Sequence, residues 1–113
     1  MMLTNQTRDT VLLTDARYAK TFWTRFLGLM GRAELPAGQG LVIEPGGSIH
    51  MFFMRFAIDA IFVDKDWKIL HISHSIKPWR ISRMVRRSKR VIEVNAGLCA
   101  STNTQPGDVL ALS

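Results

Sequence analysis

Residues 61–72 read IFVDKDWKILHI, in which two short apolar runs flank a charged turn. Val63 and Trp67 border the three-residue connection Asp64-Lys65-Asp66. A connection of this length joins neighbouring antiparallel strands, so the segment predicts a β-hairpin.

The same pattern of short apolar runs separated by turn residues recurs along most of the chain. The other short β-branched or aromatic runs are 11–13, 41–43, 51–53, 91–94 and 109–112, and clusters of Gly, Pro and Asp separate several of them. Many short strands punctuated by turns are typical of a barrel or a sandwich. We therefore expect a mostly β (α+β) fold, namely a small, barrel-like antiparallel β domain.

One segment departs from this strand pattern. Tyr18, Phe22 and Phe26 recur every four residues, which is the spacing of one helix face. We expect one N-terminal amphipathic helix over about residues 16–27, ending near Gly28 because glycine is favoured just beyond a helix C-terminus.

Length and composition predict one domain over residues 1–113, with residues 1–8 flexible. The apolar runs are too short for a membrane-spanning helix, and the polar N-terminus does not resemble a secretory signal. The chain has one cysteine, Cys99, which excludes an intramolecular disulfide and favours a buried, unreactive thiol. We expect a cytoplasmic protein.

The positive charge is concentrated in one segment. The net charge is +6, and seven of the 15 basic residues lie in 77–90, which contains no acid. Elsewhere eight bases face nine acids, so the rest of the chain is nearly neutral. We call 77–90 the basic segment. Its candidate contacts with an anion or nucleic acid are Lys77, Trp79, Arg80, Arg83, Arg86, Arg87, Lys89 and Arg90.

Three interpretations of the basic segment are open. It is a solvated connection or an edge strand whose charges discourage pairing between sheets. Alternatively, it binds nucleic acid, with arginines on phosphates and Trp79 stacking on a base. In the third interpretation it contacts an anionic membrane surface or an acidic protein.

Four segments together resemble a known family, the domain-of-unknown-function family one-nine-two of small prokaryotic proteins. They are RFLGLMGR at 25–32, SIHMFFMRFAIDAIFVD at 48–64, VIEVNAG at 91–97 and QPGDV at 105–109. The match stays in register from about residue 11 to 112. The resemblance implies a compact, barrel-like β fold with a helix near the N-terminus, and it implies no reaction. Ala57 and Gly46 depart from residues common in that family, proline and cysteine respectively.

The second of these segments carries polar residues among apolar ones. Arg55 and Asp59 either bond to each other or to a tight turn, since a guanidinium fork matches two carboxylate oxygens. Alternatively, Arg55 and Arg32 face a pocket that receives a carboxylate or phosphate. The candidate ligand-binding residues are Arg32, His50, Arg55 and Asp59.

Metal and catalytic patterns are weak. The spacing of His71 and His74 puts them on opposite faces of a strand, so with His50 they form no ready-made chelate. We expect no metal and no cofactor. Glu93 lies in the middle of an apolar strand and either points to solvent or is partly buried with a raised pKa, which marks functional sites.

The leading hypothesis is a non-enzymatic binding module for a small anionic ligand, with no catalytic residues assigned. The alternative is a nucleic-acid-associated protein that binds through residues 77–90. A second alternative is a hydrolase that uses Asp59, Glu93 or His50.

Overall fold

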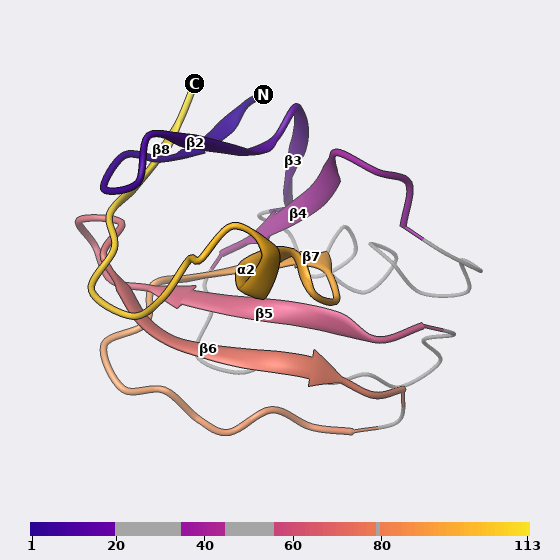
Figure 1. Ribbon diagram of the computed structural model, residues 1–113. Coiled ribbons are helices and arrows are strands. Elements are labelled where there is room, and N and C mark those ends of the chain that lie inside the picture. Colours follow the sequence, from indigo (N-terminus) through magenta and orange to yellow (C-terminus); the bar gives the residue numbers. More distant parts are fainter. Residues whose placement is uncertain (20–34, 45–55, 79) are drawn as a thin grey trace.

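The computed structural model describes residues 1–19, 35–44, 56–78 and 80–113. These residues form two β-sheets and one short helix (Figure 1). The elements are β1 (Leu3–Asn5), β2 (Thr10–Leu13), β3 (Asp15–Ala19), β4 (Gln39–Ile43), β5 (Ile58–Val63), β6 (Ile69–Ile76), β7 (Arg90–Asn95), α2 (Leu98–Ser101) and β8 (Leu110–Leu112). The mostly β fold expected from the sequence is confirmed.

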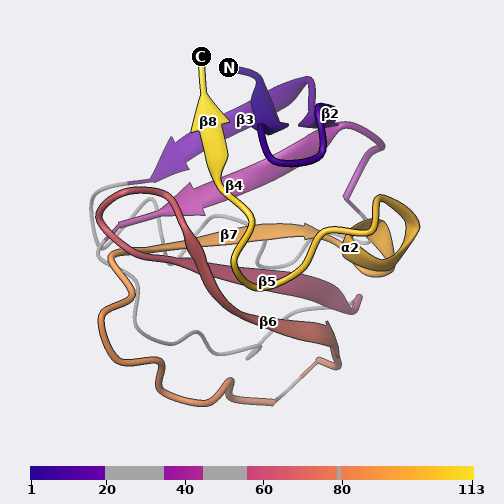
Figure 2. The same cartoon turned by 60° about the vertical axis from the view of Figure 1, so that its left-hand side comes forward.

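The strands form a three-stranded sheet of order β2-β1-β8 and a five-stranded sheet of order β3-β4-β7-β5-β6. Figures 1 and 2 show the small sheet, with both termini, packed over one face of the larger sheet. Among the described strands β3 and β6 are the edges of the larger sheet, so these strands do not close into the expected barrel. The antiparallel pattern also has an exception, because β3 pairs with β4 in parallel.

The N-terminal helix expected over residues 16–27 is not supported. Asp15–Ala19 forms strand β3, and residues 20–27 lie outside the described residues, as does the strand expected at 51–53. Alternate residues of β3 reach the core, since Ala16 is 2% exposed and Tyr18 packs against the same apolar cluster. In residues 15–19, strand pairing with β4 therefore determines the local structure, and the helical spacing of the aromatic residues does not.

The N-terminus contributes a strand to the smaller sheet. Strand β1 pairs with β2 on one side and β8 on the other, and Leu3 and Asn5 are fully buried. The backbone N–H of Met2 donates to the carbonyl of Ser113 at 2.8 Å, which joins the two ends of the chain. The mobility expected for residues 1–8 stays a prediction.

A buried polar cluster holds β1 against the turn before β8. Asp108 Oδ2 accepts hydrogen bonds from Asn5 Nδ2 (3.0 Å), Arg8 Nε (2.9 Å) and the backbone N–H of Gln105 (3.1 Å). Burial alone would raise the pKa of Asp108, but these donors outweigh it, and the net result is a lowered pKa. The cluster explains how a strand with few apolar residues is fixed in the core.

The core has two parts, one on each face of the five-stranded sheet, because strand side chains alternate between faces. The inner face packs against the three-stranded sheet; its cluster includes Leu3, Leu13, Val42, Ile61, Ile92, Val94 and Cys99. The other face, here called the opposite face, carries a second cluster with Leu35, Leu41, Ile43, Ile58, Ala60, Phe62 and Val91. Apolar side chains therefore bury both faces of the sheet.

The predicted hairpin is confirmed, but its connection spans residues 64–68 and not the expected three residues. Val63 at the end of β5 pairs with Ile69 at the start of β6. Asp64 Oδ1 accepts hydrogen bonds from the backbone N–H groups of Asp66 (2.8 Å) and Lys68 (3.0 Å). Aspartate is common at the start of such turns because its side chain can accept hydrogen bonds from the backbone N–H groups that follow.

Candidate functional site

Asp59 is a fully buried carboxylate on β5, and its two oxygens accept three backbone hydrogen bonds. Oδ1 accepts from the N–H of Ser75 at 2.9 Å. Oδ2 accepts from the N–H groups of Gly97 (3.2 Å) and Cys99 (3.1 Å) at the start of α2. Gly97 has φ of 93°, a left-handed conformation that glycine adopts at little cost. Asp59 thus joins β5, β6 and α2.

This placement favours the interpretation in which Asp59 fixes a tight turn over one in which it receives a ligand. The other three candidate ligand residues, Arg32, His50 and Arg55, lie outside the described residues. Their convergence on a pocket stays a prediction.

Cys99 is buried, as the sequence predicted. Burial raises the pKa of its thiol far above the ordinary value, and the neighbouring Asp59 carboxylate adds to the effect. A thiol that stays protonated is a poor nucleophile, so the environment of Cys99 supports a packing role.

The substitution Asp59→Asn replaces one carboxylate oxygen with an NH2 group. This group is a donor and cannot accept the hydrogen bond of the backbone N–H that faces it. We expect a loss of about 2–4 kcal/mol in the free energy of unfolding, measured by urea denaturation. The matched control Asp66→Asn changes an exposed carboxylate and is expected to cost less than about 0.5 kcal/mol. Equal stabilities for the two variants would contradict a structural role for Asp59.

Glu93 is a second buried carboxylate, and it lies in the middle of β7 on the opposite face. It is 7% exposed and pairs in register with Leu41 of β4 and Ala60 of β5. Within the described part of the chain its carboxyl group has no hydrogen-bond or ion-pair partner. Burial raises its pKa from 4.5 to about 7. Of the two alternatives open from the sequence, the buried carboxyl is confirmed.

A polar pair lies on the same face, two strands from Glu93. Ser73 of β6 pairs in register with Ala60, so Glu93, Ala60 and Ser73 form one row across the sheet. His71 Nε2 lies 3.1 Å from Ser73 Oγ, and the His71 ring lies 5.9 Å from that of Phe62. Burial lowers the pKa of His71, and the charges of nearby Arg83 and His74 lower it further.

This arrangement does not resemble a metal centre. Among residues 1–19, 35–44, 56–78 and 80–113, no group of three or more His, Cys, Asp and Glu side chains is placed to hold a metal ion.

The substitution Glu93→Gln tests the burial of this carboxyl through the pH dependence of stability. The folded pKa of about 7 lies above the ordinary 4.5, so the protonated form favours folding and its contribution is lost as the pH rises from 4.5 to 7. The glutamine variant cannot ionise, so its free energy of unfolding does not carry this loss. Measured by urea denaturation, the free energy of unfolding of the variant relative to that of the wild type should therefore increase by about 2–3 kcal/mol from pH 5 to pH 8. Parallel pH profiles for the two proteins would be inconsistent with a buried, unpartnered carboxyl.

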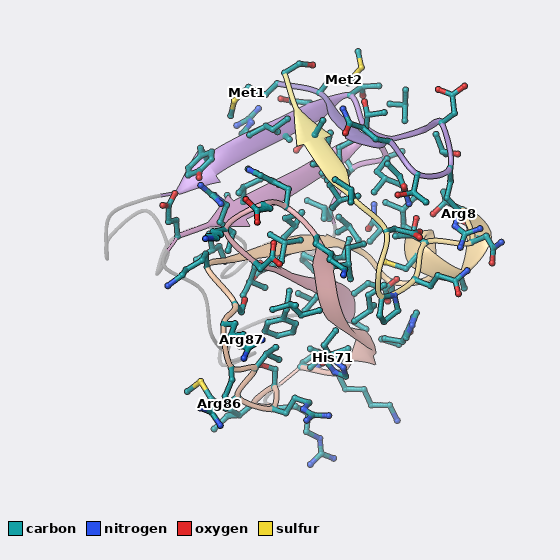
Figure 3. The ribbon with its side chains drawn as sticks, turned by 90° about the vertical axis from the view of Figure 1, so that its left-hand side faces the viewer. Met1, Met2, Arg8, His71, Arg86 and Arg87 are labelled. Atoms are coloured by element: carbon teal, nitrogen blue, oxygen red, sulfur yellow. The ribbon has the colours of Figure 1, made fainter. Side chains whose placement is uncertain are left out.

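The basic segment connects β6 to β7, and its described residues before Arg90 belong to no helix or named strand. Figure 3 shows Arg86 and Arg87 at the end of the molecule away from Met1 and Met2. The exposed bases are Lys77, Arg80, Arg83, Arg86, Arg87 and Lys89. None of them forms an ion pair with another described residue. Trp79 lies outside the described residues.

Arg90 differs from the other bases because it is packed into the fold. Its Nε donates to Tyr18 Oη at 2.8 Å and lies 3.7 Å from Glu44 Oε2. Its guanidinium group also lies 4.6 Å from the centroid of the Trp67 ring, within reach of a cation–π interaction. These contacts favour a structural role for Arg90 over contact with an external anion.

A cavity of about 320 Å³ lies between the β5–β6 hairpin turn and the end of the basic segment. Its described lining residues are Asp64, Lys65, Arg87 and Lys89, and we call it the cationic pocket. The backbone N–H of Lys89 donates to the carbonyl of Val63 at 2.8 Å and so fixes the two chain segments beside each other. The sequence indicated Arg87 and Lys89 but missed Lys65, because only the tertiary fold brings the hairpin turn to the basic segment.

The described residues define a small two-sheet β protein with a buried carboxyl, Glu93, that no described donor reaches, and a cationic connection between β6 and β7. The chain matches, over residues 3–112, the family DUF192, described as Uncharacterized ACR, and it belongs to that family. The resemblance inferred from the sequence is thereby confirmed.

Relatives cover nearly the whole chain. The UPF0127 protein PH1112 of Pyrococcus horikoshii is 34% identical over 110 residues, covering 95% of each chain. A UPF0127 protein of Thermococcus sibiricus is 32% identical over 111 residues, covering 95% of this chain and 71% of that protein.

Two solved structures share the fold. A Novosphingobium aromaticivorans protein of unknown function superposes with a TM-score of 0.83 at 24% identity, covering 98% of this chain and 82% of that one. A Sinorhizobium meliloti 1021 protein, described as a candidate transcription regulator, gives a TM-score of 0.79 at 25% identity, covering 97% of this chain and 89% of that one.

In the described part of this chain, no helix has the length and hydropathy needed to cross a membrane.

Proposed function

We propose that this protein is a non-enzymatic binding module for a small anionic ligand and that the cationic pocket receives the ligand. The observation that carries this proposal is the charge around the pocket, where three cations face one acid. The acid, Asp64, already accepts two backbone hydrogen bonds from its own turn. The local field therefore favours an anion.

The residue types favour a phosphate group or a carboxylate. Arg87 offers a planar fork of donors that matches two oxygens of either group, and lysines add compact charge. Three positive charges balance a multiply charged anion such as phosphate better than a singly charged one.

The backbone at Arg87 supports a functional role. Arg87 has φ of 69°, in the left-handed region where a residue other than glycine typically costs about 1 kcal/mol or more. It lies within a turn closed by the hydrogen bond from Ser88 N–H to the Val85 carbonyl at 3.3 Å. Arginine at a position that suits glycine is consistent with a need for its guanidinium group.

A nucleic-acid ligand is the second candidate, favoured by the exposed bases Arg80, Arg83 and Arg86, which extend the positive charge beyond the pocket. The similar Sinorhizobium meliloti protein is described as a candidate transcription regulator, which agrees with this alternative.

The hydrolase alternative has less support. Of the three residues that the sequence indicated for a hydrolase, Asp59 already accepts three backbone hydrogen bonds. His50 lies outside the described residues. Glu93 is therefore the one described candidate whose carboxyl group is not engaged in hydrogen bonds with described residues.

Titration with inorganic phosphate tests the proposal. In the wild type we expect saturable amide chemical-shift changes at residues 64–65 and 87–89. The substitution Arg87→Gly should weaken phosphate binding about tenfold or more, since a charge-assisted contact is lost. The same variant should be at least as stable as the wild type in urea denaturation, because glycine removes the unfavourable φ.

Arg86→Gln is the matched control, because Arg86 is an adjacent exposed base that is not among the described lining residues of the pocket. For a pocket ligand it should change the affinity less than about twofold. Equal losses for Arg86→Gln and Arg87→Gly, together with single-stranded RNA binding whose log K falls steeply with log salt, would instead identify nucleic acid as the ligand. No saturable phosphate binding would overturn the proposal.

A further inference from the structure

The basic segment carries two apolar side chains that the fold leaves exposed. Ile81 is 66% exposed and Met84 is 68% exposed. The other large apolar side chains that are exposed among the described residues, Met1, Met2 and Val11, reach 50% at most. Neighbouring exposed apolar side chains surrounded by polar ones are typical of an interaction surface.

Exposure along the basic segment follows a period of three residues. Ser82, Val85 and Ser88 are half-buried, and the two residues before each of them are exposed. The segment therefore presents three pairs of side chains to the outside. We call these six side chains the outward face: Arg80 with Ile81, Arg83 with Met84, and Arg86 with Arg87.

Contacts with the fold fix the position of the outward face. Val85 packs against the apolar cluster on the opposite face of the larger sheet. The backbone N–H of Ser88 donates to the Val85 carbonyl at 3.3 Å, and that of Lys89 donates to the Val63 carbonyl at 2.8 Å. Figures 1 and 2 show residues 80–89 beyond β6, at the end of the molecule away from the smaller sheet and both termini. A surface held in this way loses little conformational entropy when it binds a partner.

We propose that the outward face docks this protein on the surface of an anionic lipid bilayer. The arginines contact headgroup phosphates, and the side chains of Ile81 and Met84 enter the boundary between the headgroups and the acyl chains. Basic and apolar side chains on one surface are the combination that binds interfacial segments to anionic membranes. The docking surface differs from the cationic pocket, with which it shares only Arg87 among the described lining residues.

The charges of the outward face are available to such a surface. The basic segment contains no acid, and the four arginines of the outward face form no ion pair with another described residue. The pocket acid Asp64 opposes docking, but the pocket cations Lys65, Arg87 and Lys89 outnumber it. Each base close to an anionic bilayer strengthens binding by about fivefold.

Other partners use this surface less completely. A nucleic acid would engage the arginines, but the aliphatic side chains of Ile81 and Met84 lack the aromatic ring on which bases stack. An acidic protein would need an apolar pocket for each of these two side chains. A bilayer accepts apolar side chains of any shape, so it matches both features of the outward face.

Cosedimentation with vesicles of phosphatidylcholine and about 25% phosphatidylglycerol tests the proposal. We expect saturable binding that weakens as salt is added, and no binding to pure phosphatidylcholine. The double variant Ile81→Ser, Met84→Ser should bind about tenfold or more weakly, because it keeps the charges and loses the apolar contacts. The matched control Val11→Ser removes an exposed apolar side chain from the smaller sheet and should leave the affinity unchanged.

Insertion is measured separately with methyl-labelled methionine and nanodiscs of the same lipids that carry a nitroxide on the acyl chain near the headgroup. In the bound protein we expect the Met84 methyl signal to broaden and the signals of Met1 and Met2, which are exposed at the other end of the molecule, to stay sharp. A sharp Met84 signal in the bound protein would overturn the proposal.

The absence of binding to the anionic vesicles, equal binding to neutral vesicles, or unchanged binding by the double variant would also overturn it. Single-stranded RNA binding of equal strength in the wild type and the double variant, without vesicle binding, would identify nucleic acid as the partner of the outward face. Phosphate binding at the cationic pocket is tested independently, because the double variant keeps every described lining residue of the pocket.

Discussion

The fold depends on one buried carboxylate, that of Asp59. Its oxygens accept backbone hydrogen bonds from Ser75 of β6, from Gly97, the N-cap residue of α2, and from Cys99 in the first turn of α2. A buried charge is tolerated only when donors surround it, so Asp59 fixes the relative positions of three elements at once. Helix α2 is four residues long and has no stability of its own, so this anchor determines where it packs.

The second buried carboxyl, that of Glu93, receives no hydrogen bond from any described residue, and its surroundings differ accordingly. Asp59 and Glu93 lie on neighbouring strands, yet backbone N–H groups converge on the first, and apolar side chains surround the second. The same burial therefore produces a structural anchor in one case and a carboxyl group with a raised pKa in the other. The cationic pocket at the end of the β5–β6 hairpin is a separate, solvent-facing source of charge.

Local patterns in the sequence predicted much of this fold. Runs of β-branched and aromatic residues identified six of the eight described strands, and Asp64-Lys65-Asp66 identified the hairpin. Strand β1 was missed because its burial depends on Asn5 bonding to Asp108, 103 residues away. Strand β3 was missed because a parallel partner cannot be recognised locally. The sequence likewise indicated Glu93 as a candidate, but only the fold distinguishes its apolar surroundings from the backbone donors around Asp59.

The central claim is that the Glu93 carboxyl is buried with no hydrogen-bond or ion-pair partner among the residues that the structure describes. Titration of its carboxyl carbon by ¹³C NMR tests this claim most directly. We predict a midpoint at about pH 7 for Glu93, and loss of this signal's titration in Glu93→Gln. A midpoint near the ordinary 4.5 would show that the carboxyl is solvated or paired, and would contradict the account.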